Sequence, residues 1–333
     1  MKKIKWGIIG LGGIARKFAK DLNETEGCEI RAVASRSQVK ADEFAATFNA
    51  QKAFGSYEDL MQDKEIDIIY IATPHSHHYE NTMMCLEAGF NVLCEKAFAI
   101  NREQAVIMIE KAREKNLFLM EGLWSRFNPA ILGAFNDVKN GLIGNLCGVK
   151  ADFCFHFPYD ADKRLCNKNL GGGSLLDIGI YPIFLSYLFL GKPIRMNAEA
   201  EYFPNGTDKN LVMLFDYENG EEAILNSSLQ YFSPCDAYIY GDEGCIRIHG
   251  RWHEANAYTR FKKNMDEPIT KGFGTRPFSF KYEIDEVVAC LKEGRKESAK
   301  WSLQNSLDLM EVLDSVRKDI HLNYGAIEET KLS

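Results

Sequence analysis

The 333-residue sequence lacks the features that mark metal-binding, secreted and membrane-spanning proteins. It contains 9 cysteines, and no two of them form a CxxC pair. An odd number of cysteines without zinc or redox spacing predicts reduced thiols and a cytoplasmic location. The apolar run 178–190 contains Pro182 and is shorter than the ~20 residues that cross a bilayer. This run therefore predicts a buried helix.

The formal net charge of −7 comes with neither a basic run nor an acidic tail. A chain without clustered Lys and Arg is a poor candidate for binding nucleic acid or an anionic membrane. The hydrophobic share of 46% and the charged share of 26% are ordinary for a globular protein. The length favours two domains. We therefore expect a soluble two-domain protein whose partner is a small molecule.

Strand-like and helix-like segments alternate through residues 1–122. This βαβ succession predicts an α/β fold, a doubly wound parallel sheet with ligands at the carboxyl ends of its strands. Residues 1–122 are therefore expected to form a Rossmann domain. The expected strands span 6–9, 29–34, 66–72, 91–94 and 117–120.

The pattern changes in residues 123–333, where runs of strands follow one another between helices. Turn sequences at 219–220 and 242–244 predict hairpins. The sequence therefore predicts a second, α+β domain at 123–333 with a mostly antiparallel sheet. Its expected strands span 146–157, 196–203, 211–217, 223–229, 237–240 and 245–249.

The first strand runs into Gly10-Leu11-Gly12-Gly13-Ile14-Ala15, a GxGxxA sequence that opens a helix. Gly10 permits a tight turn, Gly12 lets the backbone approach a pyrophosphate, and Ala15 allows close packing of helix on sheet. The amides of Gly13 and Ile14 belong to the helix start, which attracts phosphate. The segment predicts a dinucleotide site.

The end of the second strand reads Ala34-Ser35-Arg36-Ser37 and contains no carboxylate. An acidic residue there would bind the ribose 2′-hydroxyl of NAD, whereas Ser35 and Arg36 suit the 2′-phosphate of NADP. We therefore predict NADP, with NAD as the alternative. The competing interpretation of Arg36 is an ordinary solvated surface arginine.

Further segments resemble the Gfo/Idh/MocA oxidoreductase family. The likeness is strongest to the branch of dimeric dihydrodiol dehydrogenases and NADP-dependent D-xylose dehydrogenases. It covers nearly the whole chain. The segments are Ala-Thr-Pro-His-Ser-His-His (72–78), Cys-Leu-Glu-Ala-Gly (85–89), Val-Leu-Cys-Glu-Lys (92–96), Leu-Phe-Leu-Met-Glu-Gly-Leu-Trp-Ser-Arg-Phe-Asn-Pro (117–129) and Gly-Gly-Gly-Ser-Leu-Leu-Asp-Ile-Gly-Ile-Tyr (171–181).

The resemblance implies that Lys96, Asp177 and Tyr181 are the catalytic residues. Lys96 matches the lysine of the family's Glu-Lys-Pro sequence, although Ala97 stands where the proline is usual. Asp177 and Tyr181 are four residues apart and would share one face of a helix. A tyrosine with a pKa near ~10 is a poor base at neutral pH, and a nearby ammonium would lower that pKa. A buried core tyrosine and a structural ion pair of Lys96 are the competing interpretations.

The resemblance also implies which other residues surround the cofactor and the substrate. Around the cofactor we expect Thr73, Pro74, His75, His78, Glu95, Lys96, Trp124 and Arg126. Around the substrate we expect Lys96, Trp124, Phe155, Asp177 and Tyr181. Phe155 has strand spacing, and an aromatic residue in that pattern more often fills a core than lines a pocket. We expect no metal, because the histidines at 75–78 are too close together to chelate one ion easily.

These features together predict an NADP(H)-dependent enzyme that oxidises a secondary alcohol of a small cyclic substrate, a sugar or a trans-dihydrodiol. One alternative is an NAD-dependent dehydrogenase of the inositol or aminosugar type. The other is a dinucleotide-sensing protein without catalysis, which would not need all three catalytic residues. Because relatives cover the outer face of the second sheet with another copy, we expect a homodimer or a dimer of dimers.

Overall fold

The computed structural model describes residues 3–264, 267–274 and 279–330. They form two compact units, each with its own sheet. The first unit comprises Met1–Trp124, Ser279–Leu307 and Glu328–Ser333, and the second comprises Ser125–Phe278 and Asp308–Ile327. The domains expected from the sequence, 1–122 and 123–333, were continuous. In the structure the chain leaves the first unit and returns to it.

The first unit contains a six-stranded sheet in the order β3-β2-β1-β4-β5-β6. Every pair of neighbouring strands is parallel. The Rossmann prediction is therefore confirmed. The strands are β1 (Ile4–Ile9), β2 (Cys28–Ala34), β3 (Lys52–Phe54), β4 (Ile68–Ile71), β5 (Asn91–Glu95) and β6 (Leu119–Gly122).

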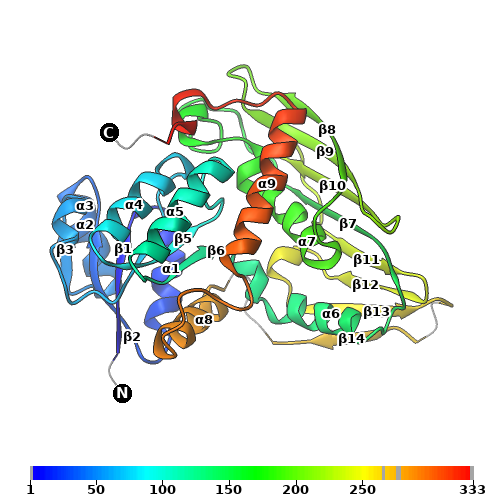
Figure 1. The fold of residues 1–333 in the computed structure, drawn as a ribbon, viewed down its shortest axis with the longest axis horizontal. Coiled ribbons are helices and arrows are strands. Elements are labelled where there is room, and N and C mark those ends of the chain that lie inside the picture. Colours follow the sequence, from blue (N-terminus) through cyan, green and yellow to red (C-terminus); the bar gives the residue numbers. More distant parts are fainter. Residues whose placement is uncertain (1–2, 265–266, 275–278, 331–333) are drawn as a thin grey trace. The chain divides into compact units, whose positions relative to one another are not determined.

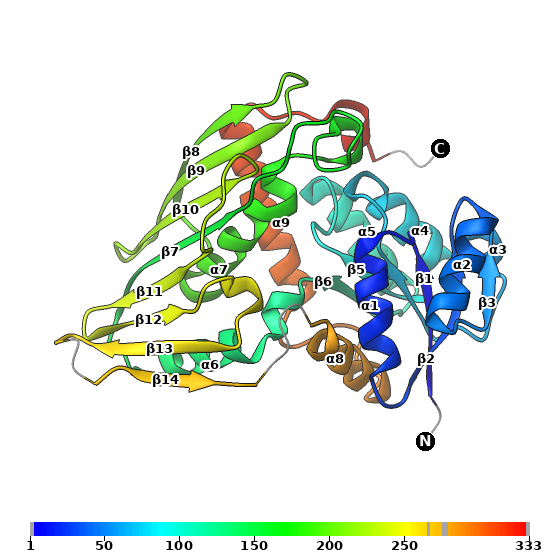
Figure 2. The ribbon, with the colours of Figure 1, turned by 180° about the vertical axis from the view of Figure 1, so that it is seen from behind.

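Helices cover both faces of this sheet, as its almost continuous apolar strands require. Figures 1 and 2 show α4 and α5 side by side on one face, whereas α1 and α2 lie on the other, where α8 also packs on α1. Side chains of Ser37 and Asn101 cap α2 and α5. The helices are α1 (Gly13–Asn23), α2 (Gln38–Phe48), α3 (Tyr57–Leu60), α4 (His78–Glu87), α5 (Arg102–Glu114) and α8 (Lys281–Lys292).

The strand order reverses between β1 and β4, which are neighbours in the sheet although β2 and β3 separate them in sequence. In a doubly wound sheet a crevice opens at the carboxyl ends of the strands where the order reverses. The loops after β1 and β4 lie at this position. They carry the Gly10 and Thr73 segments that the sequence marked for the cofactor.

The second unit contains an eight-stranded sheet in the order β14-β13-β12-β11-β7-β10-β9-β8. Only β7 and β10 pair in parallel among its described strands. The predicted mostly antiparallel sheet is confirmed, and the sequence interpretation missed β13 and β14. The strands are β7 (Leu146–Cys154), β8 (Arg195–Tyr202), β9 (Asp208–Asp216), β10 (Glu222–Ser228), β11 (Ala237–Gly241), β12 (Gly244–Ile248), β13 (Ala257–Lys262) and β14 (Ile269–Gly272).

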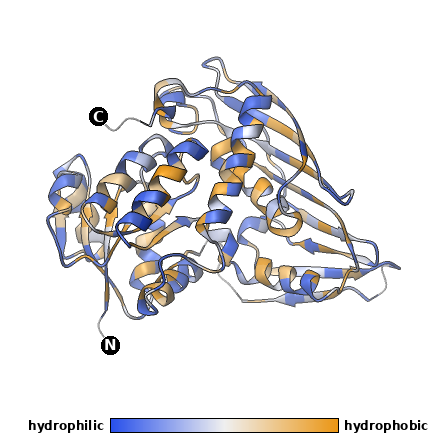
Figure 3. Cartoon of the chain, viewed as in Figure 1, coloured by the Kyte–Doolittle hydropathy of each residue, from blue (hydrophilic) through white to orange (hydrophobic). Residues whose placement is uncertain are grey.

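One face of this sheet is covered by α7 (Ile180–Leu190), which packs on β7 and β10, and by α6 (Pro129–Lys139), which packs on β12 and β13. Helix α7 is hydrophobic along nearly its whole length (Figure 3). In the described chain, one helical stretch, Lys168–Leu190, is long and apolar enough for a membrane span, with 83% of its apolar window buried. That burial fits the core helix expected there. Helix α9 (Leu303–Asp319) runs from the first unit into the second.

Candidate active site

The phosphate loop joins β1 to α1, and its first glycine has no room for a side chain. Gly10 has φ +82°, and a Cβ on it would lie 2.6 Å from the backbone of Ala72 and Thr73. The amide of Gly12 donates to the carbonyl of Gly10 at 2.8 Å and closes the turn. The loop therefore passes close against the end of β4, and only glycine permits that approach.

The next part of the loop faces open space. A Cβ on Gly12 or Gly13 would meet nothing within 4 Å, and α1 begins at Gly13. Ala15 is fully buried, as close packing of helix on sheet requires, and Ile14 is half-buried. An uncovered helix start with room beside its first amides fits the pyrophosphate of a dinucleotide. The residues present therefore fit NAD(P).

The end of β2 holds the residues expected to select the cofactor. The amide of Ser35 donates to the carbonyl of Phe54 at 3.1 Å, which fixes the strand end beside β3. Arg36 follows in the exposed turn before α2. Burial raises the pKa of Tyr57, and the positive charge of Arg36 opposes this rise, so the two side chains are near each other. The guanidinium thus stands on the surface at the strand end.

His78 joins the loop after β4 to the loop after β5. Its buried ring places Nδ1 2.7 Å from the carbonyl oxygen of Ala97 and Nε2 2.9 Å from that of Thr73. Both ring nitrogens of His78 thus lie within hydrogen-bond distance of a backbone carbonyl oxygen, one in each loop. The ring of His75 is also buried and packs edge-on at 5.6 Å, after Pro74 has begun the short helical turn. These histidines fix backbone geometry around the strand ends.

Within the residues that the structure describes, His, Cys, Asp and Glu side chains form no group of three or more that could hold a metal ion.

Glu95 and Lys96 lie at the end of β5. The hydroxyl of Tyr70 donates to Glu95 Oε1 at 2.5 Å, and the amide of Lys96 donates to Glu95 Oε2 at 3.3 Å. The Lys96–Ala97 peptide bond is cis. The side chain of Glu95 is therefore held from β4, and Lys96 is half-buried beside it.

Trp124 and Arg126 share the short helix Trp124–Phe127, and the two units divide between Trp124 and Ser125. The ring of Trp124 is 5.9 Å from that of Phe280 in the first unit. Arg126 is buried in the second unit, with its guanidinium 5.7 Å from the ring of Phe135. The structure thus assigns two residues expected beside one cofactor to different units.

In the second unit, the three glycines at 171–173 shape the start of the helix that carries Asp177. A Cβ on Gly172 would lie 2.6 Å from the carbonyl oxygen of Arg164, and one on Gly173, where φ is +119°, would collide with Asp208 Oδ1. The amide of Leu175 donates to Asp208 Oδ2 at 2.6 Å. Burial raises the pKa of Asp208 to about 7, although this hydrogen bond opposes the rise. A buried carboxyl group thus anchors the helix start.

Asp177 lies on a π-helical turn, Leu175–Gly179, that leads into α7, whereas the sequence interpretation treated the segment as one α-helix. The four-residue spacing to Tyr181 therefore spans a wider turn than an α-helix provides. Such π-turns occur often at functional sites. Arg164 Nη1 lies 2.9 Å from Asp177 Oδ1. The aspartate is thus ion-paired within its own unit.

Tyr181 is buried among aromatic rings. The ring of Phe153 is 5.4 Å away and that of His253 is 5.6 Å away, while Phe153 and His253 stack at 3.9 Å. Phe155 is half-buried just beyond β7, with its ring 6.2 Å from that of Phe153. The aromatic group therefore surrounds the tyrosine expected to transfer a proton.

Sequence reasoning missed Arg164 and His253, although the structure joins them to Asp177 and Tyr181. Arg164 lies in an irregular loop and His253 in a three-residue helical turn. Neither segment has a period that marks which side chains point inward. Only a charged residue shortly before the three glycines could have indicated Arg164, and that signal is weak.

Two models of one enzyme family together match more than half of the chain. Residues 4–123 match the model described as "Oxidoreductase family, NAD-binding Rossmann fold", and residues 136–247 match the "GFO/IDH/MocA C-terminal domain". The fold and the phosphate loop thus define an NAD(P)-binding oxidoreductase. The chain belongs to the Gfo/Idh/MocA family, as its sequence segments predicted.

Individual relatives agree with this membership. The chain is 35% identical to the trans-1,2-dihydrobenzene-1,2-diol dehydrogenase of Mus musculus, over 96% of this chain and 98% of that protein. It is 32% identical to the D-xylose 1-dehydrogenase (NADP(+)) of Hypocrea jecorina, over 98% and 94%. Among solved structures, a 3-ketoreductase from Actinomadura kijaniata in complex with NADP and TDP-benzene aligns with TM-score 0.86 and 25% identity, over 96% of this chain and 98% of that one.

Proposed function

We propose that the protein catalyses the reversible, NADP(H)-dependent oxidation of a secondary alcohol on a small cyclic substrate, a sugar or a trans-dihydrodiol. The observation that carries this proposal is full-length similarity to a dihydrodiol dehydrogenase and to a D-xylose dehydrogenase. The chain also has the family's lysine, aspartate and tyrosine at Lys96, Asp177 and Tyr181. The aromatic rings around Tyr181 suit the apolar face of a sugar ring or a cyclic diol.

The bound nicotinamide accepts or supplies the hydride. The residues around the open phosphate loop, Gly10 to Ala15, would hold the pyrophosphate through backbone amides. Arg36 would grip the 2′-phosphate, since its guanidinium is exposed at the end of β2 and no carboxylate occupies that strand end. Seven further residues complete the proposed cofactor contacts: Thr73, Pro74, His75, His78, Glu95, Trp124 and Arg126.

The protein's own side chains are proposed to carry out the proton transfer. Oxidation of an alcohol releases the hydroxyl proton, which needs an acceptor, and we assign that role to the phenol oxygen of Tyr181. Lys96 would favour the deprotonated phenol through its positive charge. Asp177 would hold substrate hydroxyl groups, and its ion pair with Arg164 fixes the direction of its carboxylate. Trp124 and Phe155 are proposed as walls of the substrate site.

The test is a panel of aldoses, polyols and trans-dihydrodiols, with NADPH formation followed by fluorescence. Turnover of at least one cyclic substrate is expected, and Tyr181→Phe should reduce kcat by ~10²–10⁴-fold, the usual contribution of a general acid–base group. NADP affinity should stay unchanged in this variant. If folded Tyr181→Phe kept near-full activity, the proton-transfer role would instead be assigned to Lys96.

Asp177→Asn provides a second measurement of the assigned roles. Because the residue is proposed to hold hydroxyl groups rather than to transfer a proton, KM should rise while kcat changes less. Circular dichroism provides the folding control, since Asp177 is buried beside Arg164. A loss confined to kcat would contradict this assignment.

We also propose a homodimer, or a dimer of dimers, formed through the uncovered face of the second sheet. Side chains alternate along the strands, so β9 and β10 present apolar residues outward: Val212 is 53% exposed, Leu214 42% and Ile224 51%. Exposed apolar patches of this kind mark interaction sites. Their regular alternation over neighbouring strands fits a self-complementary surface.

Sedimentation analysis tests the dimer. The protein should sediment above its 37.8 kDa chain mass at micromolar concentration. Ile224→Glu should dissociate it, because the charge would be buried at the interface. Val39→Glu, at a 66% exposed position of α2, is the matched control and should leave the assembly unchanged. A stable monomer of the unmodified protein would refute the proposal.

Finally, we propose a cytoplasmic location. The 9 cysteines of the chain are free, and 7 of them are buried. Burial raises the pKa of Cys154 to about 11 and keeps this thiol in its unreactive form. Free, inert thiols are typical of a reducing compartment. Localisation of a fluorescent fusion would test this.

A further inference from the structure

The carboxyl group of Glu283 on α8 is fully buried, and no function has been assigned to it. Its side chain has 0% exposure, and within the described chain neither of its oxygens has a hydrogen-bond partner. An ionised carboxylate in this condition would cost several kcal/mol, and buried polar groups without partners are rare. The group therefore requires a physical explanation.

The packing of α8 places Glu283 near the strand ends of the first sheet. One turn earlier on this helix, the ring of Phe280 contacts Phe18 of α1 at 5.5 Å. Phe18 in turn stacks on Tyr70 of β4 at 3.7 Å, and the hydroxyl of Tyr70 donates to Glu95. This chain of contacts connects α8 with the end of β5, directly before Lys96.

Glu283 belongs to a group of buried acids that we call the carboxyl cluster: Glu95, Glu121 and Glu283, with exposures of 5%, 1% and 0%. Glu121 Oε2 accepts a hydrogen bond from Trp301 Nε1 at 3.0 Å. Burial raises the pKa of Glu121 above its ordinary value, and its hydrogen bonds, followed by the positive charge of Lys96, oppose this rise. Lys96 is thus electrostatically part of this cluster.

The members of the cluster cannot all be ionised. Burial first, and then the negative charges of Glu95 and Glu121, raise the pKa of Glu283 well above its usual range. Burial and Glu95 likewise raise the pKa of the Tyr70 phenol well above its ordinary value. When acids share one buried site, the proton stays on the member with the least compensation.

Other charged groups near α8 have their own partners. Asp21 of α1 accepts the amide of Phe280 at 2.7 Å, where the helix begins. Glu286, one turn after Glu283, lies 2.5 Å from Lys300 Nζ and 3.2 Å from Arg295 Nη1. The Glu286 carboxylate is therefore compensated, whereas that of Glu283 is not.

We propose that Glu283 is a positioning residue that keeps a proton beside Glu95 and Glu121 and so determines how firmly the carboxyl cluster holds the Lys96 ammonium. While Glu283 is neutral, the cluster carries less negative charge. When it loses its proton at alkaline pH, the added charge strengthens the hold on the lysine proton. Lys96 therefore stays charged further into the alkaline range. The importance of this effect rests on the catalytic role proposed for Lys96, but its measurement does not.

The experiment measures the titration of Lys96 in the full-length protein by competitive acetylation across pH 7–11 with peptide mass spectrometry. Glu283→Gln removes the titrating group at nearly constant shape. The apparent pKa of Lys96 should fall by roughly 0.5–1 unit in this variant, less than for a group in direct contact. An unchanged titration of Lys96 would overturn the proposal.

Glu286→Gln is the matched control on the same helix, and it should leave the titration of Lys96 unchanged. Should Glu283→Gln not fold, Glu283→Met is of similar size, is also neutral, and is expected to give the same shift. Infrared difference spectroscopy adds a direct measurement: at neutral pH the carbonyl band of protonated acids should be weaker in the Glu283 variant than in the unmodified protein, by the contribution of one carboxyl group. Absence of that difference would overturn the proposal.

The failures of the two proposals are distinguishable. If Lys96→Met retained turnover, the catalytic role of the lysine would be wrong, yet the acetylation result would stand. If the titration of Lys96 were the same with and without Glu283, the positioning role would be wrong, whatever the activity of the Lys96 variant.

Discussion

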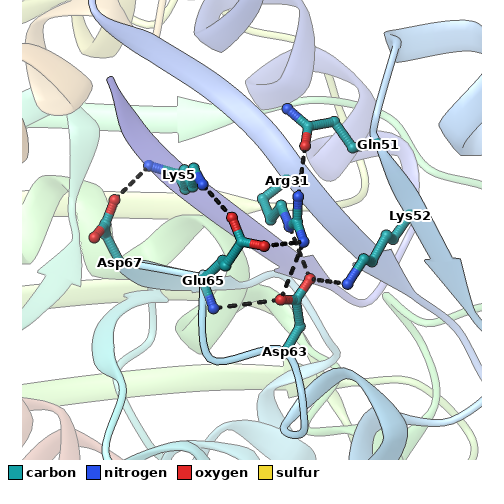
Figure 4. A network of polar contacts seen from close by, with 7 residues as sticks. All are labelled: Lys5, Arg31, Gln51, Lys52, Asp63, Glu65 and Asp67. Carbon is teal, nitrogen blue, oxygen red and sulfur yellow. Dashed lines mark hydrogen bonds and ion pairs between the residues drawn. The ribbon is translucent and has the colours of Figure 1, made fainter. Parts of the chain in front are cut away.

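The two ends of the parallel sheet in the first unit differ in how their charged side chains are paired. Near the amino ends of β1, β3 and β4, acids and bases form a connected network (Figure 4). Arg31 donates to Asp63 and Glu65 at 2.8 Å, and Lys52 lies 3.1 Å from Asp63. Other links join Lys5, Gln51 and Asp67 to this network.

At the carboxyl ends of the same strands, one buried acid has no such partner. Neither oxygen of Glu283 has a hydrogen-bond partner within the described residues, and Lys96 is a cation that acts on the neighbouring Glu121. Paired charges at one end fix the strands, whereas under-compensated charges at the other leave groups whose protonation can change. This difference fits the proposed function, in which the amino end stabilises the sheet and the carboxyl end carries the proposed chemistry.

The largest expected effect comes from comparing the loss of one lysine at each end of the sheet, Lys96 at the carboxyl end and Lys52 at the amino end. Lys96→Met should reduce kcat by ~10²–10⁴-fold with little loss of stability, since it removes a charge proposed to act on the proton. Weaker NADP binding is also expected, because Lys96 is itself proposed to contact the cofactor. Lys52→Met, in the amino-end network, should retain turnover. Steady-state kinetics and urea unfolding measure turnover and stability in both variants. Equal losses of kcat would contradict the proposed difference between the two ends.

A smaller effect is expected from Asp63→Asn at the amino end. The aspartate is buried and accepts from Arg31 and Lys52, so the free energy of unfolding should fall by about 1–3 kcal/mol. Cofactor affinity should not change. Asp59→Asn, at an exposed position of α3, is the control and should leave stability nearly unchanged. A change in NADP affinity would show that the ends are not independent.

The same variant predicts a pH dependence. Burial alone would raise the pKa of Asp63, but hydrogen bonds from Arg31 and Lys52 leave it below its ordinary value. A carboxyl group with a lowered pKa in the folded state stabilises above its unfolded pKa of about 3.9 and loses that contribution as pH falls through the folded value. The free energy of unfolding, measured from pH 7 down to about pH 2, should therefore fall more steeply below about pH 4 in the unmodified protein than in Asp63→Asn.

The smallest effect concerns cofactor choice at the carboxyl end. Arg36→Ala should weaken NADP binding about tenfold and erase most of its advantage over NAD, as loss of one charge-assisted contact would. Lys20→Ala removes the same charge from the exposed end of α1 and should not change the ratio. Equal affinities for NADP and NAD in the unmodified protein would contradict the role of Arg36.

The sequence allowed most of the fold to be predicted, because short-range patterns encode it. Runs such as 66–72 are apolar enough to predict a buried parallel strand, and Gly10 to Ala15 predict the loop after β1. Strands β13 and β14 were missed because their residues are largely polar or basic and lack a clear apolar alternation. Local pattern carries little information on such strands, of which β14 is at the sheet edge and β13 is its neighbour.

The candidate site could be predicted only in part. Lys96, Asp177 and Tyr181 stand in recognisable segments, whereas Arg164 and Glu283 become notable only through what lies beside them in space. The ion pair of Arg164 with Asp177 and the isolation of Glu283 are products of packing. The packing of α8 in the first unit could not be predicted from its hydrophobic periodicity either, because an amphipathic pattern does not indicate which sheet a helix will cover.

The discontinuity of the first unit has a consequence for how such proteins are made and recombined. Phe280 lies in the segment that covers Phe18, and this segment is synthesised only after residues 125–278. The backbone carbonyls of Glu328 and Thr330 accept from Asn101 and Tyr79, so a third stretch closes the same unit. A single crossover between two genes of this family would therefore exchange parts of a core instead of whole modules, and its products should fold poorly.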